Sequence, residues 1–365
     1  MNEKELLILQ LINANPFISQ IELAEKTHLS RSAVAGYISS LTKEGKLLGR
    51  AYVLPKQKDI ISIGGANIDR KIQALNHLQF GTSNPAESSQ SCGGVARNIA
   101  ENLGRLGCNV SLMTIVGEDH EGEWLLDYTK TFVDISPSQV SPNLATGTYT
   151  AILDNEGEMA VALADMAIYD SIDIDFIEKK WGYLASSAMV VMDTNLSADV
   201  LKHVIVRCKE DNIPLCITPV SSPKVKRLPE SLQGVTWLIA NRDEAEALSE
   251  MTINDEDDFF KAAEKIMKKG VEKVVLTRGD KGLIYLTQQG EKGILHPPKV
   301  HVEDVTGAGD SLVAGIMFGH LNGLNTEDAC KIGISCSVLT LQSHETVNPA
   351  LNHIRLQETF QQYFK

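Results

Sequence analysis

The sequence predicts an α/β protein in which a mostly parallel sheet is covered by helices on both faces, behind a small helical domain. After residue 58, short apolar segments alternate with helical ones, an order typical of such a sheet. Charge also divides the chain, because residues 1–58 carry +3 and the whole chain −13, which leaves −16 for the rest. We therefore expect two domains with different partners, residues 1–57 and residues 58–365.

Composition indicates a globular protein with a large core. The chain has 365 residues, of which 43% are apolar and 22% charged. No apolar run approaches the roughly 18 residues that a membrane span needs, and the first residues lack a signal-peptide pattern. The six cysteines are scattered without a CxxC pair, which favours a reducing compartment over a disulfide framework or zinc site. We expect a cytoplasmic protein without a membrane partner.

The amino-terminal segment predicts three helices. Glu3–Asn13 is rich in Leu and Ile and ends before a proline. Ser19 and Glu22 form a capping-box pattern, so a second helix should reach about Lys26. Ser30 should cap the third helix after a short turn.

The third helix has two different faces. Val34, Ile38 and Leu41 recur at helical spacing and should be buried. The opposite face begins with Arg31 and Ser32 and offers small or polar groups. Such a face is suited to entering a groove of DNA.

Gly45–Leu54 alternates enough to form a two-stranded hairpin with Gly49 at its turn. With the preceding helices it resembles a winged helix-turn-helix DNA-binding domain over residues 1 to about 55, followed by a linker, Pro55–Lys58. A helical protein-interaction or dimerisation module is the alternative. The side chains expected at DNA are Arg31, Ser32, Lys46 and Arg50.

The remaining chain predicts strands and helices in alternation. Val95–Leu106 reads as a helix, and Thr146–Leu163 as a hairpin that turns at Asp154–Gly157. The predicted strands of the main sheet are Ile60–Ile63, Val110–Val116, Ala188–Met192, Pro214–Thr218, Thr236–Ala240 and Val274–Thr277.

The segment Asp304–Asp310 (DVTGAGD) opens an apolar helix, Ser311–His320. Neither GxGxxG after a strand nor GxxxxGK[ST] occurs, so phosphate chemistry requires another glycine turn. Bare N–H groups at a helix start attract anions, and Asp310 would lie there as a base that stays ionised. A simple helix-capping role is the alternative for Asp310.

Together, four motifs resemble the ribokinase-like (phosphofructokinase-B type) carbohydrate kinases over residues 59–365. They are Gly64–Asp69, Gly93–Asn98, Asn241–Glu244 and Asp304–Asp310, in the order that the family has. The resemblance implies a ribokinase-like sheet sandwiched by helices and a small β lid from about residues 67–92 and 144–167. It also implies ATP and Mg²⁺ as cofactors, K⁺ as a further ion, and a homodimer paired through the lids.

The resemblance assigns a sugar-binding role to five residues. An amide beside a carboxylate can pair with vicinal hydroxyls, although both are also frequent in turns. A tight helix entry is the competing interpretation of the glycine pair. The residues are Asn67, Asp69, Gly93, Gly94 and Asn98.

The nucleotide site is implied in the same way. Asn241 and Glu244 would lie near the phosphates, with Glu244 facing Mg²⁺ through water, although the pair also reads as a capping box. Asp304 and Thr306 take the positions of the monovalent-cation site. The remaining ATP contacts would be Thr277, Gly279 and, in the adenine loop, Asn348.

The implied mechanism follows the charge. The amides of Gly307, Ala308 and Gly309, with Mg²⁺, would stabilise the transferring phosphoryl group. Asp310 would then accept the proton of a primary hydroxyl.

Two lid fragments, Gly81–Pro85 and Ala164–Tyr169, resemble pseudouridine kinases together with Gly93–Asn98. Asn84 and Asp165 could bind a uracil-like edge. We therefore expect phosphorylation of a nucleoside 5′-hydroxyl, with pseudouridine preferred. Inosine, adenosine, another ribonucleoside and free ribose are alternatives. A ligand-sensing transcription regulator on a kinase fold, or an active kinase that also binds DNA, also remains open.

Overall fold

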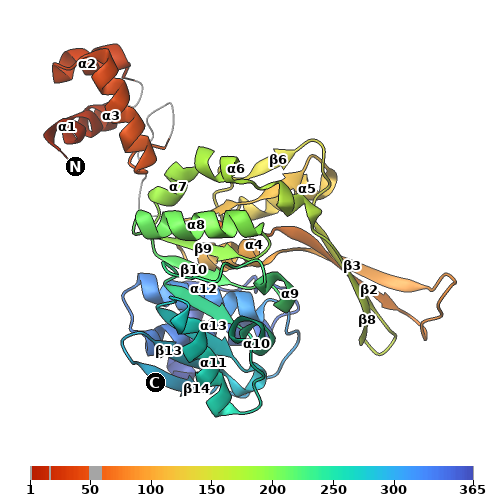
Figure 1. Ribbon diagram of the computed structural model, residues 1–365. Coiled ribbons are helices and arrows are strands. Elements are labelled where there is room, and N and C mark those ends of the chain that lie inside the picture. Colours follow the sequence, from red (N-terminus) through yellow and green to blue (C-terminus); the bar gives the residue numbers. More distant parts are fainter. Residues whose placement is uncertain (1, 16–17, 49–59, 365) are drawn as a thin grey trace.

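A computed structural model describes residues 2–15, 18–48 and 60–364, and shows a small helical domain beside a larger α/β domain (Figure 1). Arg50, the turn at Gly49 and the linker Pro55–Lys58 lie outside the described residues, as does most of the predicted hairpin Gly45–Leu54. None of the described helices is long and apolar enough to cross a membrane.

The amino-terminal domain consists of α1 (Glu3–Ala14), α2 (Gln20–Thr27) and α3 (Arg31–Lys43), as predicted. Ser19 and Glu22 form the expected capping box. Its core includes Val34 and Leu41, both fully buried, with Ile38 packed against them, so the predicted inner face of α3 is confirmed.

The main sheet has the strand order β14-β13-β12-β11-β10-β9-β1-β4, and the six strands from β12 to β4 are parallel. The predicted parallel sheet is therefore confirmed, whereas the antiparallel β13–β14 hairpin at its edge was not predicted. The strands are β1 (Ile60–Ile63), β4 (Val110–Met113), β9 (Met189–Asp193), β10 (Leu215–Thr218), β11 (Trp237–Ala240), β12 (Lys273–Thr277), β13 (Leu283–Thr287) and β14 (Lys292–Leu295).

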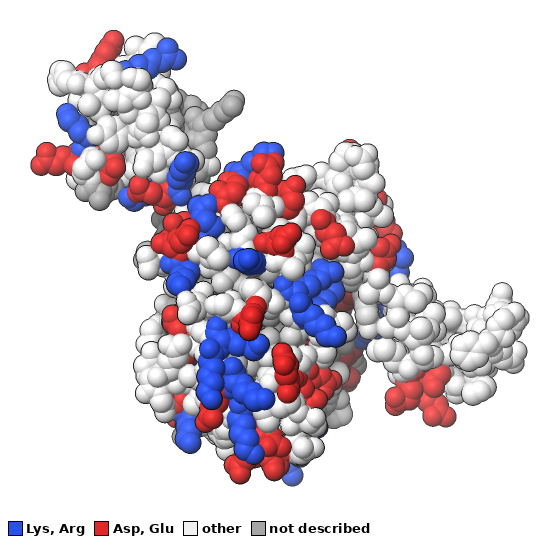
Figure 2. All heavy atoms as spheres, viewed as in Figure 1, with Lys and Arg blue, Asp and Glu red and all other residues white. Residues whose placement is uncertain are grey.

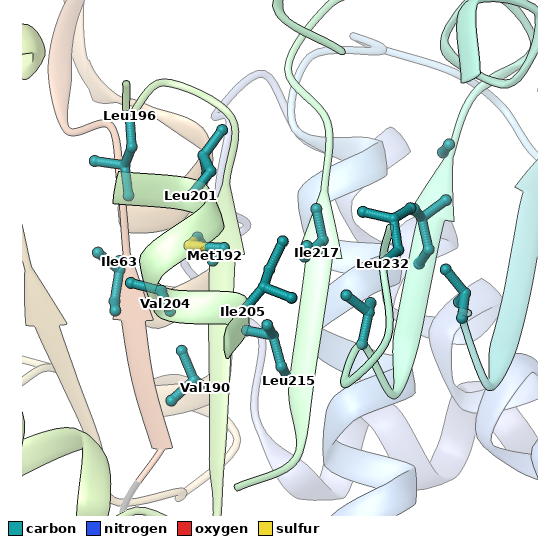
Figure 3. Close-up of a cluster of buried hydrophobic side chains, with 14 of the residues drawn as sticks. Ile63, Val190, Met192, Leu196, Leu201, Val204, Ile205, Leu215, Ile217 and Leu232 are labelled. Atoms are coloured by element: carbon teal, nitrogen blue, oxygen red, sulfur yellow. The ribbon is translucent and has the colours of Figure 1, made fainter. Parts of the chain in front are cut away.

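Helices cover both faces of this sheet. Alternate strand side chains point to opposite faces, so Val190 and Met192 pack towards α8 (Figure 3), while Val191 joins the cluster under α4, α12 and α13. The helices are α4 (Val95–Arg105), α5 (His120–Thr129), α6 (Ile174–Lys179), α7 (Trp181–Ala185), α8 (Ala198–Glu210), α9 (Ser222–Val225), α10 (Arg242–Ser249), α11 (Glu256–Lys268), α12 (Ala308–Leu321), α13 (Thr326–Leu341) and α14 (His353–Phe364), with 3₁₀ turns η1 (Ala167–Ser171) and η2 (Gly279–Lys281).

A second, four-stranded sheet in the order β3-β2-β7-β8 projects from the α/β body (Figure 1). We call it the lid sheet; its strands are β2 (Asn67–Ala74), β3 (Ala86–Gly93), β7 (Thr148–Leu153) and β8 (Met159–Asp165). The predicted strand Val110–Val116 is split, because after β4 the chain leaves the main sheet and β5 (Ile115–Gly117) pairs with β6 (Gln139–Ser141).

Helices α12 and α13 pack backbone against backbone. A Cβ atom added to Gly315 would lie 2.7 Å from the Gly333 Cα and 2.8 Å from the Cys336 Sγ. Real Cβ atoms do not approach other atoms so closely, so α12 has no space in which to shift. Its first turn carries Asp310.

Gly315→Ala should lower the free energy of unfolding by about 1–3 kcal/mol, because the added methyl group overpacks this contact. Gly309→Ala is a matched control in the same helix, since a Cβ atom there meets nothing within 4 Å. Denaturant unfolding of both variants tests the prediction. Equal stability of the two variants would contradict it.

Candidate active site

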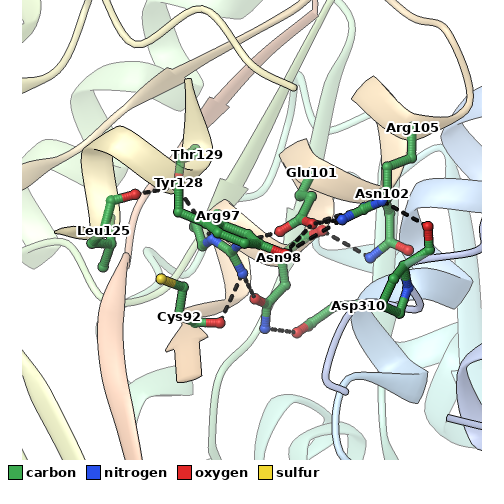
Figure 4. Close-up of polar contacts among 11 residues, drawn as sticks. Cys92, Arg97, Asn98, Glu101, Asn102, Arg105, Leu125, Tyr128, Thr129 and Asp310 are labelled. Atoms are coloured by element: carbon green, nitrogen blue, oxygen red, sulfur yellow. Dashed lines mark hydrogen bonds and ion pairs between the residues drawn. The ribbon is translucent and has the colours of Figure 1, made fainter. Parts of the chain in front are cut away.

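The site is centred on a hydrogen bond between two helices that are far apart in sequence. Asp310 stands in the first turn of α12, and Asn98 in α4. The Asn98 Nδ2 donates to the Asp310 Oδ2 at 2.8 Å (Figure 4). The structure thus brings the GGVARN and DVTGAGD motifs together, as the sequence interpretation required.

Asn67 and Asp69 lie together at the root of the lid sheet. They point to the same side of β2, and the Asn67 Nδ2 donates to the Asp69 Oδ1 at 2.6 Å. Gly93 faces Asn67 across the ladder, and a Cβ atom there would lie 2.1 Å from the Asp69 Oδ2. Glycine at this position is therefore needed to admit the Asp69 carboxylate. Burial raises the pKa of Asp69.

Gly94 starts α4 with φ 98°, in the region that favours glycine. A Cβ atom there would lie 2.4 Å from the Gly65 carbonyl oxygen, so the turns after β1 and β3 touch through their backbones. This contact fixes the position of Asn98, four residues further along α4.

Two residues that the sequence interpretation missed hold these turns in place. Asp193 ends β9 and is fully buried; its Oδ2 accepts from the Gly65 N–H at 2.8 Å and the Ala96 N–H at 3.2 Å. The Tyr169 hydroxyl donates to the Ala66 carbonyl at 2.6 Å and accepts from the Ala66 N–H at 2.9 Å. A signal for Asp193 existed, because it directly follows a predicted parallel strand, where ligand sites form.

Burial raises the pKa of Asp310 to about 7. The Asn98 hydrogen bond lowers this pKa, whereas the nearby carboxylates of Asp193 and Asp69 raise it further. The expectation that the helix start keeps Asp310 fully ionised is therefore wrong near neutral pH. Desolvation and two like charges outweigh the helix dipole here.

The glycine turn before α12 forms as expected, but one of its amides is already engaged. Gly307 has φ 79°, and a Cβ atom there would lie 2.0 Å from the Thr346 carbonyl oxygen. The Ala308 N–H donates to the Val305 carbonyl at 3.3 Å, which corrects the expectation that it faces a phosphoryl group. Helix geometry gives Gly309 and Asp310 no acceptor one turn earlier within α12, so their N–H groups suit an anion.

Asn241 and Glu244 lie at the start of α10 as a reciprocal capping box. The Asn241 Oδ1 accepts from the Glu244 N–H and the Glu244 Oε2 from the Asn241 N–H, both at 2.9 Å. Burial raises the pKa of Glu244 to about 7. The structure thus shows the capping role. A carboxylate here also fits a Mg²⁺ ion that takes its other ligands from phosphate and water.

Thr277 and Gly279 lie beside that capping box. Thr277 ends β12, which pairs with β11, the strand that leads into Asn241. Gly279 has φ 62°, and a Cβ atom there would meet nothing within 4 Å. The predicted phosphate-facing residues thus share the carboxyl edge of the sheet.

Asp304 and Thr306 form a closed set of contacts. The Asp304 Oδ1 accepts from the Thr306 N–H at 2.8 Å and hydroxyl at 2.6 Å. The Asp304 Oδ2 pairs with the Lys71 ammonium of the lid sheet at 2.5 Å. These contacts lower the pKa of Asp304 to about 2 despite the opposing effect of burial. Each carboxylate oxygen can still accept a further contact, so the K⁺ role of these two residues stays a prediction.

Two other predicted contact residues make local hydrogen bonds in the structure. Asn348 is buried, and its side chain donates to the Leu339 carbonyl and accepts from the Ala350 N–H, so it anchors its loop, and its contact with ATP stays a prediction. Asn84 forms hydrogen bonds with Gln79 and Thr82 in the loop that precedes β3. It therefore lies at the opposite end of β3 from Gly93.

Asp165 is placed differently from Asn84. It ends β8 opposite Thr148, and Thr148 lies opposite Ile68. Asp165 is exposed at the same end of the lid sheet as Asn67 and Asp69, but the register places it on the face of Ile68, opposite to theirs.

The model of the pfkB family carbohydrate kinases matches residues 57–353. The chain belongs to this family of kinases. The protein named "Pseudouridine kinase" of Escherichia coli (strain K12) is 33% identical over 299 residues, 81% of this chain and 95% of that protein. "Uncharacterized sugar kinase YeiI" of the same organism is 29% identical over 353 residues, 96% of this chain and 97% of that protein. The structure of a carbohydrate kinase from Agrobacterium tumefaciens is similar with a TM-score of 0.73, at 29% identity, over 84% of this chain and 97% of that one.

This pfkB-family kinase also carries an amino-terminal domain that matches the winged helix-turn-helix DNA-binding model over residues 1–47. Arg31 and Ser32 are exposed at the start of α3, whereas Lys46 pairs with Glu44. In the view of Figure 2, acidic and basic side chains are interspersed over this domain. The predicted surface at α3 is therefore accessible, but it is not strongly basic in that view.

Asp310→Asn should raise the thermal stability of the kinase at about pH 8. In the wild type the pKa of Asp310 rises on folding from 3.8 to about 7, so folding becomes less favourable as the pH rises through this window. The amide removes that penalty, and its oxygen can still accept from Asn98.

Thermal unfolding of both proteins across the pH range measures the effect. The stability advantage of Asp310→Asn should shrink below about pH 4, where the wild-type carboxyl is neutral in both states. An advantage that does not depend on pH would count against the raised pKa.

Proposed function

We propose that this kinase transfers the γ-phosphoryl group of ATP to the 5′-hydroxyl of a nucleoside, and that pseudouridine is its preferred substrate. The observation that carries the proposal is the Asn98–Asp310 pair beside Asn67 and Asp69. The 33% identity to a protein named "Pseudouridine kinase" supports the substrate.

In this mechanism the Asn67 amide and Asp69 carboxylate hold the two ribose hydroxyls. Asp310 accepts the proton of the 5′-hydroxyl as the oxygen–phosphorus bond forms and the bond to the ADP oxygen breaks. The N–H groups of Gly309 and Asp310 face the negative charge that spreads over the transferring group. Glu244 would hold Mg²⁺ through water, and the ion would neutralise phosphate charge.

Asp165 is the lid residue that we propose for base recognition. A carboxylate accepts hydrogen bonds only, so it suits a base edge that presents N–H donors. Pseudouridine has one more ring N–H than uridine, because its ribose is joined to carbon. A site that pairs this N–H should favour pseudouridine over uridine.

The lid sheet also supports the proposal of a homodimer. Val161 and Leu163 occupy one side of the edge strand β8 and are 42% and 61% exposed, and Met159, beyond a bulge, is 58% exposed. Exposed apolar side chains in a continuous row are typical of a surface that pairs with a partner. We propose that a second lid sheet covers this row.

An assay of ADP release with pseudouridine, uridine, inosine and ribose tests the function. We expect kcat/KM for pseudouridine to exceed the others by about tenfold or more. Asp310→Asn should lower kcat by about 10²–10⁴-fold while nucleoside binding in calorimetry changes little. Parallel assays with and without K⁺ test whether the rate of ADP release depends on a monovalent cation.

A preference for ribose would overturn the nucleoside assignment. Near-normal turnover by Asp310→Asn would remove the proposed base. No turnover with any acceptor, together with ligand-dependent DNA binding, would favour the ligand-sensing regulator.

The winged helix-turn-helix match favours a second function, DNA binding by the same chain. The carboxyl end of α3 approaches α7, since a Cβ atom on Gly182 would lie 3.2 Å from the Thr42 carbonyl oxygen. The amino end of α3, with Arg31 and Ser32, is exposed and is the end that would enter DNA.

Arg31→Ala should weaken binding to promoter DNA about tenfold or more in mobility-shift assays at a fixed low salt concentration. Lys43→Ala removes the same charge at the other end of α3 and should weaken binding less. No shift with the wild type would favour a protein-interaction role for this domain. Equal losses of DNA affinity in both variants would show that Arg31 acts only through general charge attraction.

A further inference from the structure

Arg97 is a buried cation directly behind the Asn98–Asp310 pair (Figure 4). Its side chain is 2% exposed, although it carries a full charge. Burying a guanidinium is costly unless its donors are paired. Arg97 has such partners, because it donates to the Cys92 carbonyl at 2.8 Å and pairs with the Glu101 carboxylate.

One further donation determines the orientation of Asn98. The Arg97 Nη1 donates to the Asn98 Oδ1 at 2.9 Å, and the Asn98 Nδ2 donates to the Asp310 Oδ2 at 2.8 Å. If the amide were reversed, its NH₂ group would face the guanidinium and its oxygen would face the carboxylate. Both contacts would then be repulsive, so Arg97 allows only the orientation that donates to Asp310.

The network around Arg97 is rigid. The Arg105 Nε donates to the Glu101 Oε1 at 2.8 Å, so one carboxylate lies between two guanidinium groups. The Tyr128 ring lies 5.3 Å from the Arg97 guanidinium carbon. The contact with Cys92 ties the network to the end of β3, next to Gly93. Arg97 therefore has little freedom to change its direction of donation.

We propose that Arg97 is a positioning residue for phosphoryl transfer, which orients the Asn98 amide so that Asn98 aligns Asp310 with the acceptor hydroxyl. This inference rests on the proposed function, in which Asp310 is the base. Besides Asn98, the groups that affect Asp310 are Asp69 from β2, Asp193 from β9 and Arg97 itself. The two carboxylates favour its protonated form, and the Asn98 donation together with the charge of Arg97 opposes them.

Arg97→Met removes the donors at similar length, and Arg97→Lys keeps a charge for Glu101 without the two-directional donation. In both variants we expect kcat to fall by about tenfold to hundredfold, because a misaligned base is costly. The acidic limb of the kcat/KM profile should move to higher pH, and the nucleoside Kd should stay close to wild type. The ¹³C titration of Asp310 in the free enzyme should show the same upward shift.

Tyr128→Phe is the matched control, because its hydroxyl contacts only the outer side of the network, at Glu101 and Arg105. It should leave the pH profile unchanged.

Lower thermal stability of the Arg97 variants, with wild-type kcat and pH profile in the folded fraction, would show a purely structural role and overturn the proposal. If Arg97→Met does not fold, Arg97→Lys decides by the same criteria. If Asp310→Asn is inactive while both Arg97 variants behave as wild type, only the positioning role fails. Activity of Asp310→Asn would instead overturn the proposed function.

Discussion

The hydrogen bond between Asn98 and Asp310 is the contact on which the arrangement of the site depends. It joins α4 to α12, and each helix is held by a separate backbone contact. Gly94 touches Gly65 at the start of α4, and Gly315 touches Gly333 within α12. Because neither helix can shift, two side chains separated by 212 positions meet at hydrogen-bond distance. Close packing thus provides the precision that a reacting carboxylate requires.

The cost of that precision is an unfavourable concentration of negative charge. Asp69, Asp193 and Asp310 lie near one another, and burial raises the pKa of all three. Ionising these carboxyl groups is unfavourable in the folded protein, and such perturbed pKa values are typical of functional sites. Catalytic carboxylates in other enzymes reach pKa values near neutrality by the same combination of burial and like charge.

Much of the fold could be predicted, because a strand buried on both faces must be apolar along its length. Ile60–Ile63, which is apolar except for Ser62, and Val190 with its neighbours show that pattern. Asn67 could be placed near the site because polar residues after parallel strands meet at one edge. The use of each side chain could not be predicted. The sequence does not reveal that the side-chain amides of Asn348 and Asn84 donate to nearby backbone carbonyls. Nor does it reveal that Lys71 pairs with Asp304.

The lid strand β2 carries its polar residues in a row. Asn67, Asp69 and Lys71 alternate with outward residues and therefore share one side of the strand, with neighbours about 7 Å apart. The first two contact each other at the proposed sugar site, and the third reaches the turn before α12 through Asp304. A pleated strand moves as one piece. Any hinge motion of this sheet would therefore move Asn67, Asp69 and the Lys71–Asp304 contact together, so the proposed sites for the acceptor and for ATP would be coupled.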